Sequence, residues 1–311
     1  MITPQTLLFR WKNHHHPLVR HLLERRISCR SSSSTTTTTV SPPPPHLPHA
    51  TFIPEIIHDA ADLPKDEPVP IQLQESFQHQ TPLVLRQAAA SLPAVQSWHS
   101  LEYLRQKFAQ SQEVGHVEMG ASYLNPTLPR ADQVPLASYV DYLELFAQQY
   151  GSKTDDIWNK DETISSDEIL YLAQNDLPLS LQDDVPLPEW LNHKQCLSPE
   201  HMGHVYSCML WLGPKGCGSP LHYDPLDNLL IQIVGRKLVW VLPPGTRLPE
   251  SHQSNTSTMD LEDPNPNVIQ QEVQDIQYTV LHPSDVLYLP RTWWHQVRSL
   301  DASASVNVWF R

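Results

Sequence analysis

The sequence predicts an α+β protein, with helices in its first half and a β-barrel in its second. Two observations indicate this division. Apolar residues between 100 and 150 recur at helical spacing. From about residue 204, short apolar runs rich in β-branched and aromatic residues are separated by Gly, Pro, Ser and Asp. With 311 residues, 40% of them hydrophobic, the chain is long enough to bury a core without covalent staples.

Residues 1–50 are expected to form a disordered basic head. Its stretch 31–49 consists mainly of Ser, Thr and Pro, and such a composition cannot bury a core. The head carries six basic residues and one acidic residue, a net charge of +5. Leaders that are rich in Arg and Ser and poor in acids are also typical of mitochondrial transit peptides, which is the alternative interpretation.

Residues 51–180 are expected to form a helical unit that packs on the barrel. Within it, residues 81–87 have the apolar run of a strand. Residues 100–111 and 136–150 have helical spacing, and the first of these two segments begins with a capping serine. Residues 166–177 are too short a segment to assign, so helix and strand both remain open for them.

Residues 181–311 are predicted to form the barrel. Several short strands separated by turn residues are typical of a sandwich or barrel. The predicted strands are HVYSCMLWLG, NLLIQIVG, KLVWVLPP, IQYTVLHP, DVLYLP and SASVNVWF.

The charge of the chain is divided unevenly. The whole chain carries −13, so the part after the head carries −13 − 5 = −18. A body this acidic argues against binding a nucleic-acid backbone and favours a basic protein or peptide as partner. No apolar run approaches 18 residues, so we expect no membrane span. Oligomeric state is not indicated by any feature of the sequence.

Cysteine usage indicates a reducing compartment. The four cysteines form no C-x-x-C pair, and no secretory signal is evident. We therefore expect an intracellular protein of the nucleus or cytoplasm, with the mitochondrion as the alternative if the head is a transit peptide.

Three residues of the barrel half suggest a metal site. His222 and Asp224 lie two positions apart, so in a strand their side chains would share one face. His295 follows the predicted strand DVLYLP and could supply a third ligand. Two imidazoles and one carboxylate form the facial triad that holds Fe(II) and leaves positions open for a co-substrate and dioxygen. On its own, an H-x-D pair is also common by chance.

A second element strengthens the metal interpretation. Lys237 begins a very apolar strand, where a buried ammonium would be costly without an anionic partner. A dicarboxylate co-substrate would supply that partner, and the hydroxyl of Ser219 could bind the same carboxylate. The alternative is a lysine exposed at a hairpin turn.

The stretches SPLHYDPLDNLLIQIVGRKLVWVLPP and LHPSDVLYLPRTWWHQV resemble the JmjC family of Fe(II)- and 2-oxoglutarate-dependent oxygenases. The order and spacing of H-x-D, the following Asn, the Lys and the distal His carry the resemblance, which extends over residues 51–311 and is strongest to the arginyl-hydroxylase branch. It implies a double-stranded β-helix, that is, a cupin or jelly-roll barrel, and a dioxygenase that uses Fe(II), 2-oxoglutarate and dioxygen.

The resemblance also implies roles for individual residues. His222, Asp224 and His295 would hold the iron and act in catalysis. Cofactor-binding residues would be Lys237, Ser219, Tyr171, Asn228 and Asn307, the last being a position where family members differ. Substrate-binding residues would be Glu118, Trp211 and Trp309. Each residue outside the triad also has a structural alternative, such as core packing for the tryptophans or a solvated charge for Glu118.

Within this family, hydroxylation of an arginine side chain is the preferred expectation. Histone methyl-lysine demethylation is one alternative, although no zinc-finger pattern accompanies the barrel. Hydroxylation of a tRNA base is another, which the acidic body argues against. A non-catalytic or zinc-binding cupin would keep the two histidines but would not need Lys237 or Ser219.

Overall fold

The computed structural model describes most of the chain after the head. The described residues are 42–44, 46–57, 71–123, 129–150, 158, 164, 168–187, 205–249, 255–263 and 273–311. Residues 1–41, which hold most of the predicted basic head, lie outside them. No helix among the described residues is long and apolar enough to cross a membrane.

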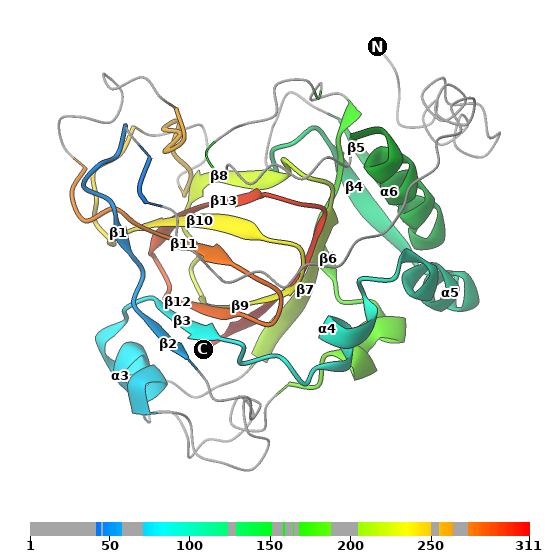
Figure 1. The fold of residues 1–311 in the computed structure, drawn as a ribbon, viewed down its shortest axis with the longest axis horizontal. Coiled ribbons are helices and arrows are strands. Elements are labelled where there is room, and N and C mark those ends of the chain that lie inside the picture. The colour runs from blue at the N-terminus through cyan, green and yellow to red at the C-terminus, as the bar shows by residue number, and fades with distance from the viewer. Residues whose placement is uncertain are drawn as a thin grey trace.

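Two β-sheets form the centre of the molecule (Figure 1). The five-stranded sheet has the order β1 (Thr51–Phe52), β11 (Gln277–Leu281), β10 (Lys237–Leu242), β13 (Trp294–Ser299) and β8 (Gly218–His222). The nine-stranded sheet has the order β2 (Glu55–Ile57), β3 (Leu83–Arg86), β12 (Val286–Leu289), β9 (Asp227–Val234), β14 (Ser303–Phe310), β7 (Val205–Gly213), β6 (Leu170–Asp176), β4 (Val114–Met119) and β5 (Arg130–Pro135). This arrangement confirms the predicted jelly-roll barrel.

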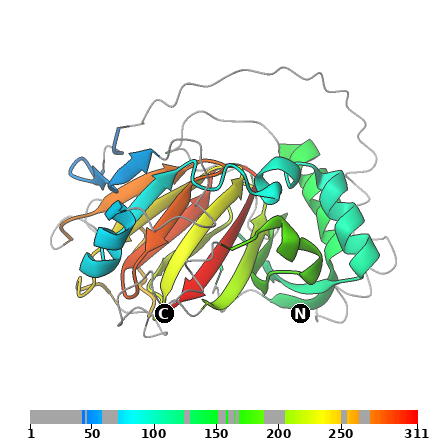
Figure 2. The ribbon, with the colours of Figure 1, turned by 90° about the horizontal axis from the view of Figure 1, so that it is seen from below.

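The helices lie outside the barrel (Figures 1 and 2). Their bounds are α3 Ile71–His79, α4 Pro93–Ser97, α5 Leu101–Ser111, α6 Leu136–Tyr150 and the 3-10 helix η2 Leu179–Asp184. The two longest, α5 and α6, pack together beside β4 and β5, and α3 lies at the other end of the molecule. The helices predicted at 100–111 and 136–150 are confirmed, and Ser100 caps α5 by accepting a hydrogen bond from the Tyr103 amide.

Strands from the first half of the chain complete both sheets. β1 pairs with β11, and β2 and β3 extend the larger sheet beyond β12. The segment 166–177, for which helix and strand were both open, is strand β6 and pairs with β7. The helical unit expected at 51–180 therefore also contributes six strands, and the two halves share one framework.

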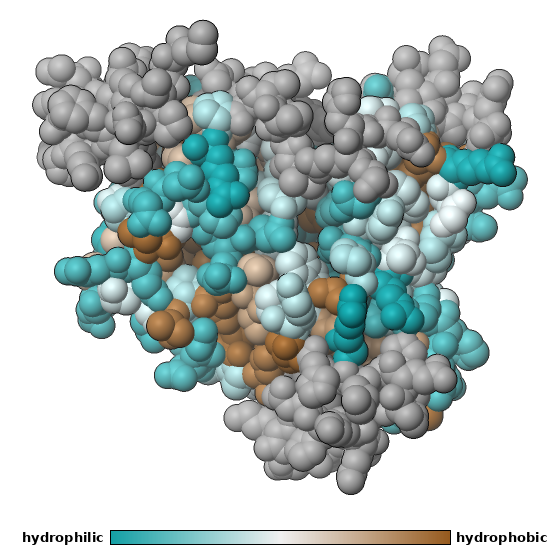
Figure 3. All heavy atoms as spheres, turned by 180° about the vertical axis from the view of Figure 1, so that it is seen from behind, coloured by the Kyte–Doolittle hydropathy of each residue, from teal (hydrophilic) through white to brown (hydrophobic). Residues whose placement is uncertain are grey.

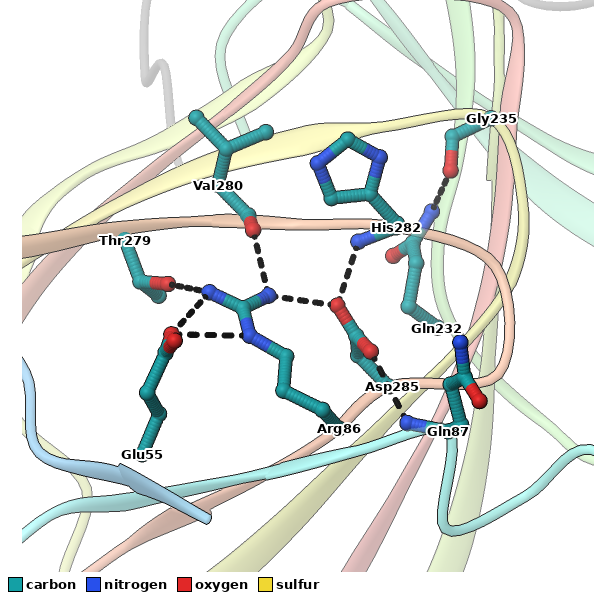
Figure 4. Close-up of polar contacts among 9 residues, drawn as sticks. All are labelled: Glu55, Arg86, Gln87, Gln232, Gly235, Thr279, Val280, His282 and Asp285. Atoms are coloured by element: carbon teal, nitrogen blue, oxygen red, sulfur yellow. Dashed lines mark hydrogen bonds and ion pairs between the residues drawn. The ribbon is translucent and has the colours of Figure 1, made fainter. Parts of the chain in front are cut away.

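A polar network ties these first-half strands to the barrel (Figure 4). Arg86 at the end of β3 donates to Asp285 before β12 at 2.6 Å, to Glu55 of β2 at 2.7 Å and to the Val280 carbonyl of β11 at 2.8 Å. Asp285 is buried and also accepts hydrogen bonds from two backbone amides. One side chain thus fixes three strands relative to one another.

The interior between the sheets positions the site. Every residue of β10 is buried, and so is nearly every residue of β9 and β14. Because alternate residues of a strand point to opposite faces, half of each strand faces the barrel interior. Apolar side chains such as Val239, Leu230 and Leu287 fill part of this interior. The polar residues of the predicted site face the remaining space.

Candidate functional site

Two neighbouring strands and one loop bring the predicted metal ligands together. β8 ends at His222, which lies opposite His295 of β13 in the antiparallel register. Asp224 follows β8 in the loop that leads to β9. One ligand atom from each residue lies within 4.8 Å of the others, and the two imidazole rings have centroids 4.1 Å apart. These distances place two nitrogens and one carboxylate oxygen around a single point.

Backbone carbonyls orient both imidazoles. Nδ1 of His222 lies 2.9 Å from the Pro220 carbonyl, and Nδ1 of His295 lies 3.0 Å from the Trp293 carbonyl. A carbonyl can only accept, so each Nδ1 carries the proton and each Nε2 keeps its lone pair for a ligand. Burial lowers the pKa of His222 to about 4, which keeps its ring neutral and ready to bind a cation. This donor set suits Fe(II).

Lys237 is a buried cation without a buried anion beside it. The residue is 3% exposed, and its Nζ donates to the Ser305 hydroxyl at 2.6 Å. No ion pair of Lys237 occurs within the described part of the chain. Burial lowers its pKa to about 7. Burying a charged ammonium group away from water is unfavourable. A ligand carboxylate would offset this desolvation, because it would pair with the ammonium group inside the barrel.

One cavity of about 190 Å³ connects the metal ligands with Lys237. The predicted site residues that line it are Tyr171, Trp211, Ser219, His222, Asp224, Lys237, His295, Asn307 and Trp309. The Ser219 hydroxyl is buried and has no hydrogen-bond partner among the described residues. An unpartnered donor close to an unpaired ammonium is what a dicarboxylate such as 2-oxoglutarate requires.

Two predicted residues lie outside the lining of this cavity. Asn228 is 1% exposed, and neither atom of its side-chain amide has a partner in the described structure. Glu118 lies on β4 opposite Tyr171, and its carboxylate is 3.9 Å from the guanidinium of Arg130. Burial raises the pKa of Glu118. The structure therefore brings Glu118 near the site but not into its wall.

The cavity lining includes a hydrogen-bonded pair, Tyr123 and Gln174, that was not identified from the sequence; Asn255 is a further polar residue of the lining that was not identified. The Tyr123 hydroxyl donates to Oε1 of Gln174, and both side chains line the cavity. Burial, followed by the nearby Asp224 carboxylate, raises the pKa of Tyr123 to about 12. Gln174 has φ of 50° and lies in an irregular part of the β6–β7 register. A left-handed residue inside a strand turns the chain locally, and no sequence pattern reveals such a bulge.

Comparison with known proteins identifies the family. Residues 68–311 match the model of the cupin-like domain. The chain is 30% identical over 244 residues to "Jumonji C domain-containing protein 5" of Drosophila melanogaster, which covers 75% of this chain and 55% of that protein. It is 32% identical over 241 residues to "Lysine-specific demethylase 8" of Xenopus tropicalis, covering 74% of this chain and 48% of that protein.

A third relative has a different printed name. Over 254 residues the chain is 25% identical to "tRNA wybutosine-synthesizing protein 5" of Danio rerio, covering 77% of this chain and 71% of that protein. The chain spans about half the length of the first two relatives. Together with the barrel and its His–Asp–His centre, these matches show that the chain belongs to the cupin-like family, among the JmjC-domain proteins.

Proposed function

We propose that the chain is an Fe(II)- and 2-oxoglutarate-dependent protein hydroxylase that oxidises an arginine side chain. A substrate C–H bond becomes C–OH, one atom of dioxygen enters the substrate, and the other enters succinate as 2-oxoglutarate loses CO2. Bound iron and 2-oxoglutarate supply the oxidising chemistry. The protein residues hold both groups, exclude water and present the substrate.

The buried Lys237 carries this proposal. A triad alone would also suit a zinc cupin, but a zinc cupin has no need of an ammonium group inside the barrel. Lys237 lines the same cavity as the triad, and its partner there is the neutral hydroxyl of Ser305. A dicarboxylate that reaches from the metal towards Lys237 uses both features at once. Ser219 and Tyr171 line the cavity beside it and would bind the same carboxylate.

Arginine is supported by the aromatic residues of the cavity. Trp211 and Tyr123 line it with rings 5.1 Å apart in an edge-to-face arrangement, and aromatic faces attract guanidinium groups. The Glu118 carboxylate is close enough to raise the pKa of Tyr123, and a carboxylate is a bidentate partner of arginine. The net charge of −18 after residue 50 favours a basic peptide. The face seen in Figure 3 carries both hydrophilic residues and an apolar patch in its lower half.

Methyl-lysine demethylation is the second candidate. It uses the same oxidation on an N-methyl group, and one of the relatives above is named as a lysine demethylase. A trimethylated ammonium has no N–H to donate, so Glu118 could offer it only charge, whereas it could accept two hydrogen bonds from arginine. The two candidates therefore differ in how strongly they depend on Glu118.

Succinate release in the presence of peptides tests the proposal. We expect an arginine-rich peptide to stimulate 2-oxoglutarate turnover and to gain one oxygen atom by mass spectrometry. Asp224→Ala should abolish turnover and iron binding while the circular dichroism spectrum is retained, since the carboxylate is 19% exposed at the cavity and takes no part in the core. Asp141→Ala, at an exposed position of α6, is the matched control. Stimulation only by methyl-lysine peptides would favour the second candidate, and full activity of Asp224→Ala would refute the metal assignment.

A further inference from the structure

The short turn between β12 and β13 leads directly into one of the metal ligands. The turn comprises residues 290–293, and His295 is the second residue of the strand that follows it. Nδ1 of His295 lies 3.0 Å from the carbonyl of Trp293, the last residue of the turn. A rotation of that peptide group would redirect the hydrogen bond and with it the imidazole, whose Nε2 faces the metal. The orientation of this ligand therefore depends on what holds the turn.

The turn has a backbone conformation that neighbouring contacts must hold. Thr292 has φ of 67°, which is unfavourable for a β-branched residue. Conformations of this kind persist where the surrounding structure fixes them. The Thr292 amide donates to the Asp224 carbonyl at 2.8 Å, so one of these contacts joins the turn to the residue of a second metal ligand.

Two further contacts come from residues that are not metal ligands. The Arg291 amide donates to Oδ1 of Asp227 at 2.9 Å, and Asp227 is 3% exposed. The indole Nε1 of Trp293 donates to the carbonyl of Gln80 at 2.8 Å. Gln80 directly follows the last residue of α3, so the first half of the chain holds a turn of the barrel.

The side chain of Gln80 makes a second connection to the same turn. Its Nε2 donates to the Tyr288 hydroxyl at 3.0 Å, and that hydroxyl donates to Oδ1 of Asp227 at 3.3 Å. Tyr288 is fully buried, and Phe77 of α3 packs on it edge to face with ring centroids 4.7 Å apart. The contacts thus leave Gln80 through its amide group and return to its carbonyl through Trp293. We call Gln80, Asp227, Tyr288 and Trp293 the turn clamp.

The turn clamp lies outside the catalytic cavity. Among the described residues that line the cavity, none belongs to the clamp. Trp293 is 9% exposed and packs with apolar side chains such as Leu287 and Leu289. The clamp residues therefore act on the site through the turn, because they do not line the space in which the co-substrate and the substrate would lie.

We propose that the turn clamp is a positioning device for the metal centre, which holds the Trp293 carbonyl so that His295 presents Nε2 to the metal; this inference rests on the metal site of the function proposed above. Partners that orient a ligating histidine typically contribute about tenfold to hundredfold to metal affinity. The indole of Trp293 acts one contact further from the metal, so we expect a contribution of about threefold to tenfold. The end of α3 would thereby form part of the metal centre.

Titration of the metal-free protein with Co(II) in the presence of 2-oxoglutarate tests the inference. Co(II) is a divalent ion whose visible absorption reports its coordination geometry. Trp293→Phe removes the indole N–H and keeps an aromatic ring in the core. It should weaken Co(II) binding by about threefold to tenfold and alter the absorption band.

The other arm of the clamp gives a second variant pair. Asp227→Ala removes the acceptor of the Arg291 amide and should also weaken Co(II) binding and alter the band. Asp227→Asn retains an oxygen at the same position and should restore both. Equal weakening in Asp227→Ala and Asp227→Asn would contradict a role that depends on this acceptor, and would overturn the inference.

Trp98→Phe is the matched control for a general loss of stability. Trp98 is 2% exposed, and its indole Nε1 donates to Asp184 at 2.8 Å, the same distance as in the contact of Trp293. It follows α4 and does not line the cavity. The substitution should lower the urea midpoint but leave the affinity and the absorption band of Co(II) unchanged. Equal weakening of Co(II) binding in Trp98→Phe and Trp293→Phe would overturn the inference.

The remaining outcomes separate this inference from the proposed function. If the unaltered protein binds Co(II), His295→Ala loses it and Trp293→Phe behaves like the unaltered protein, the metal site stands and the inference is overturned. If the unaltered protein does not bind Co(II), or His295→Ala binds it unchanged, the metal assignment fails and the inference fails with it. No substrate enters the titration, so a wrong choice of arginine cannot produce either result.

Discussion

At the scale of single residues, Lys237 explains more of the site than any other side chain. It is buried, its pKa is lowered by burial, and it donates to one neutral hydroxyl. Lys237→Ala should raise the KM for 2-oxoglutarate by about two orders of magnitude, because removing one member of a buried charge pair typically costs about 2–5 kcal/mol. Succinate formation at varied 2-oxoglutarate measures this. An unchanged KM would separate the lysine from the co-substrate.

The same residue predicts a pH dependence of stability. Lys237 has a pKa of about 7 in the folded protein, against about 10.4 in an unfolded chain. Between these two pH values the unfolded state binds up to one more proton than the folded state. The free energy of unfolding therefore rises with pH by up to about 1.4 kcal/mol per pH unit. Below pH 7 the lysine is protonated in both states and contributes no pH dependence. Urea titrations at pH 7, 8 and 9 should show this gain relative to Lys237→Met. Saturating 2-oxoglutarate with Fe(II) should abolish it, because the bound carboxylate keeps the lysine charged.

The sequence revealed the residues of the site whose chemistry depends on type and spacing. His222, Asp224 and His295 are of residue types that bind metals, and the structure brings one ligand atom of each within 4.8 Å of the others. Tyr123 and Gln174 were missed because their place depends on a left-handed residue inside β6. Their contribution to the cavity comes from backbone geometry, which local sequence patterns do not encode.

At the scale of secondary-structure elements, the residue that caps the C-terminus of α5 has a strained backbone conformation. Gln112 follows its last residue with φ of 54°, a left-handed conformation that costs a residue with a side chain about 1 kcal/mol. Gln112→Gly should therefore raise the free energy of unfolding by about 0.5–1 kcal/mol. Gln106→Gly, the same exchange in the interior of α5, should lower it by about 1 kcal/mol. Thermal unfolding of both variants checks the sign, and two losses of equal size would contradict the capping argument.

Sequence periodicity predicted the helices whose apolar residues recur within a short segment. α5 and α6 have apolar residues at helical spacing, and both formed where expected. Helix and strand both stayed open for β6 because the segment is short. In the structure its middle is buried on both faces, so the alternation that marks a strand is also missing. β1 and β2 are two and three residues long and pair with strands far along the chain, so only the assembled sheets define them.

At the scale of the whole molecule, the first half of the chain and the barrel are expected to unfold as one unit. β1 belongs to the smaller sheet, and β2 and β3 belong to the larger one. Arg86 of β3 binds Glu55 of β2, the Val280 carbonyl of β11 and Asp285 before β12 (Figure 4). Asp285→Ala should lower the free energy of unfolding by about 3 kcal/mol, because it leaves a partly buried guanidinium and two backbone amides without their acceptor. Asp141→Ala removes an exposed partner of Arg105 and should cost less than about 1 kcal/mol.

Denaturation followed by tryptophan fluorescence and by circular dichroism measures both quantities. We expect the two signals to change together in the unaltered protein and in Asp285→Ala, since no sheet belongs to one half alone. Two separate transitions would mean that the first-half strands detach before the barrel melts.

The lone ammonium of Lys237 has a consequence for the life of the protein in a cell. Ligands that bind only the folded state stabilise it by about 2.7 kcal/mol when present at a hundred times their Kd. Proteases act on the small fraction of molecules that is transiently open, and that fraction falls by about a hundredfold for the same gain. A dicarboxylate that neutralises Lys237 therefore protects the chain as well as serving its chemistry. The half-life of the protein should lengthen when 2-oxoglutarate is plentiful and shorten when it is scarce, so that metabolic supply sets the amount of protein as well as its rate.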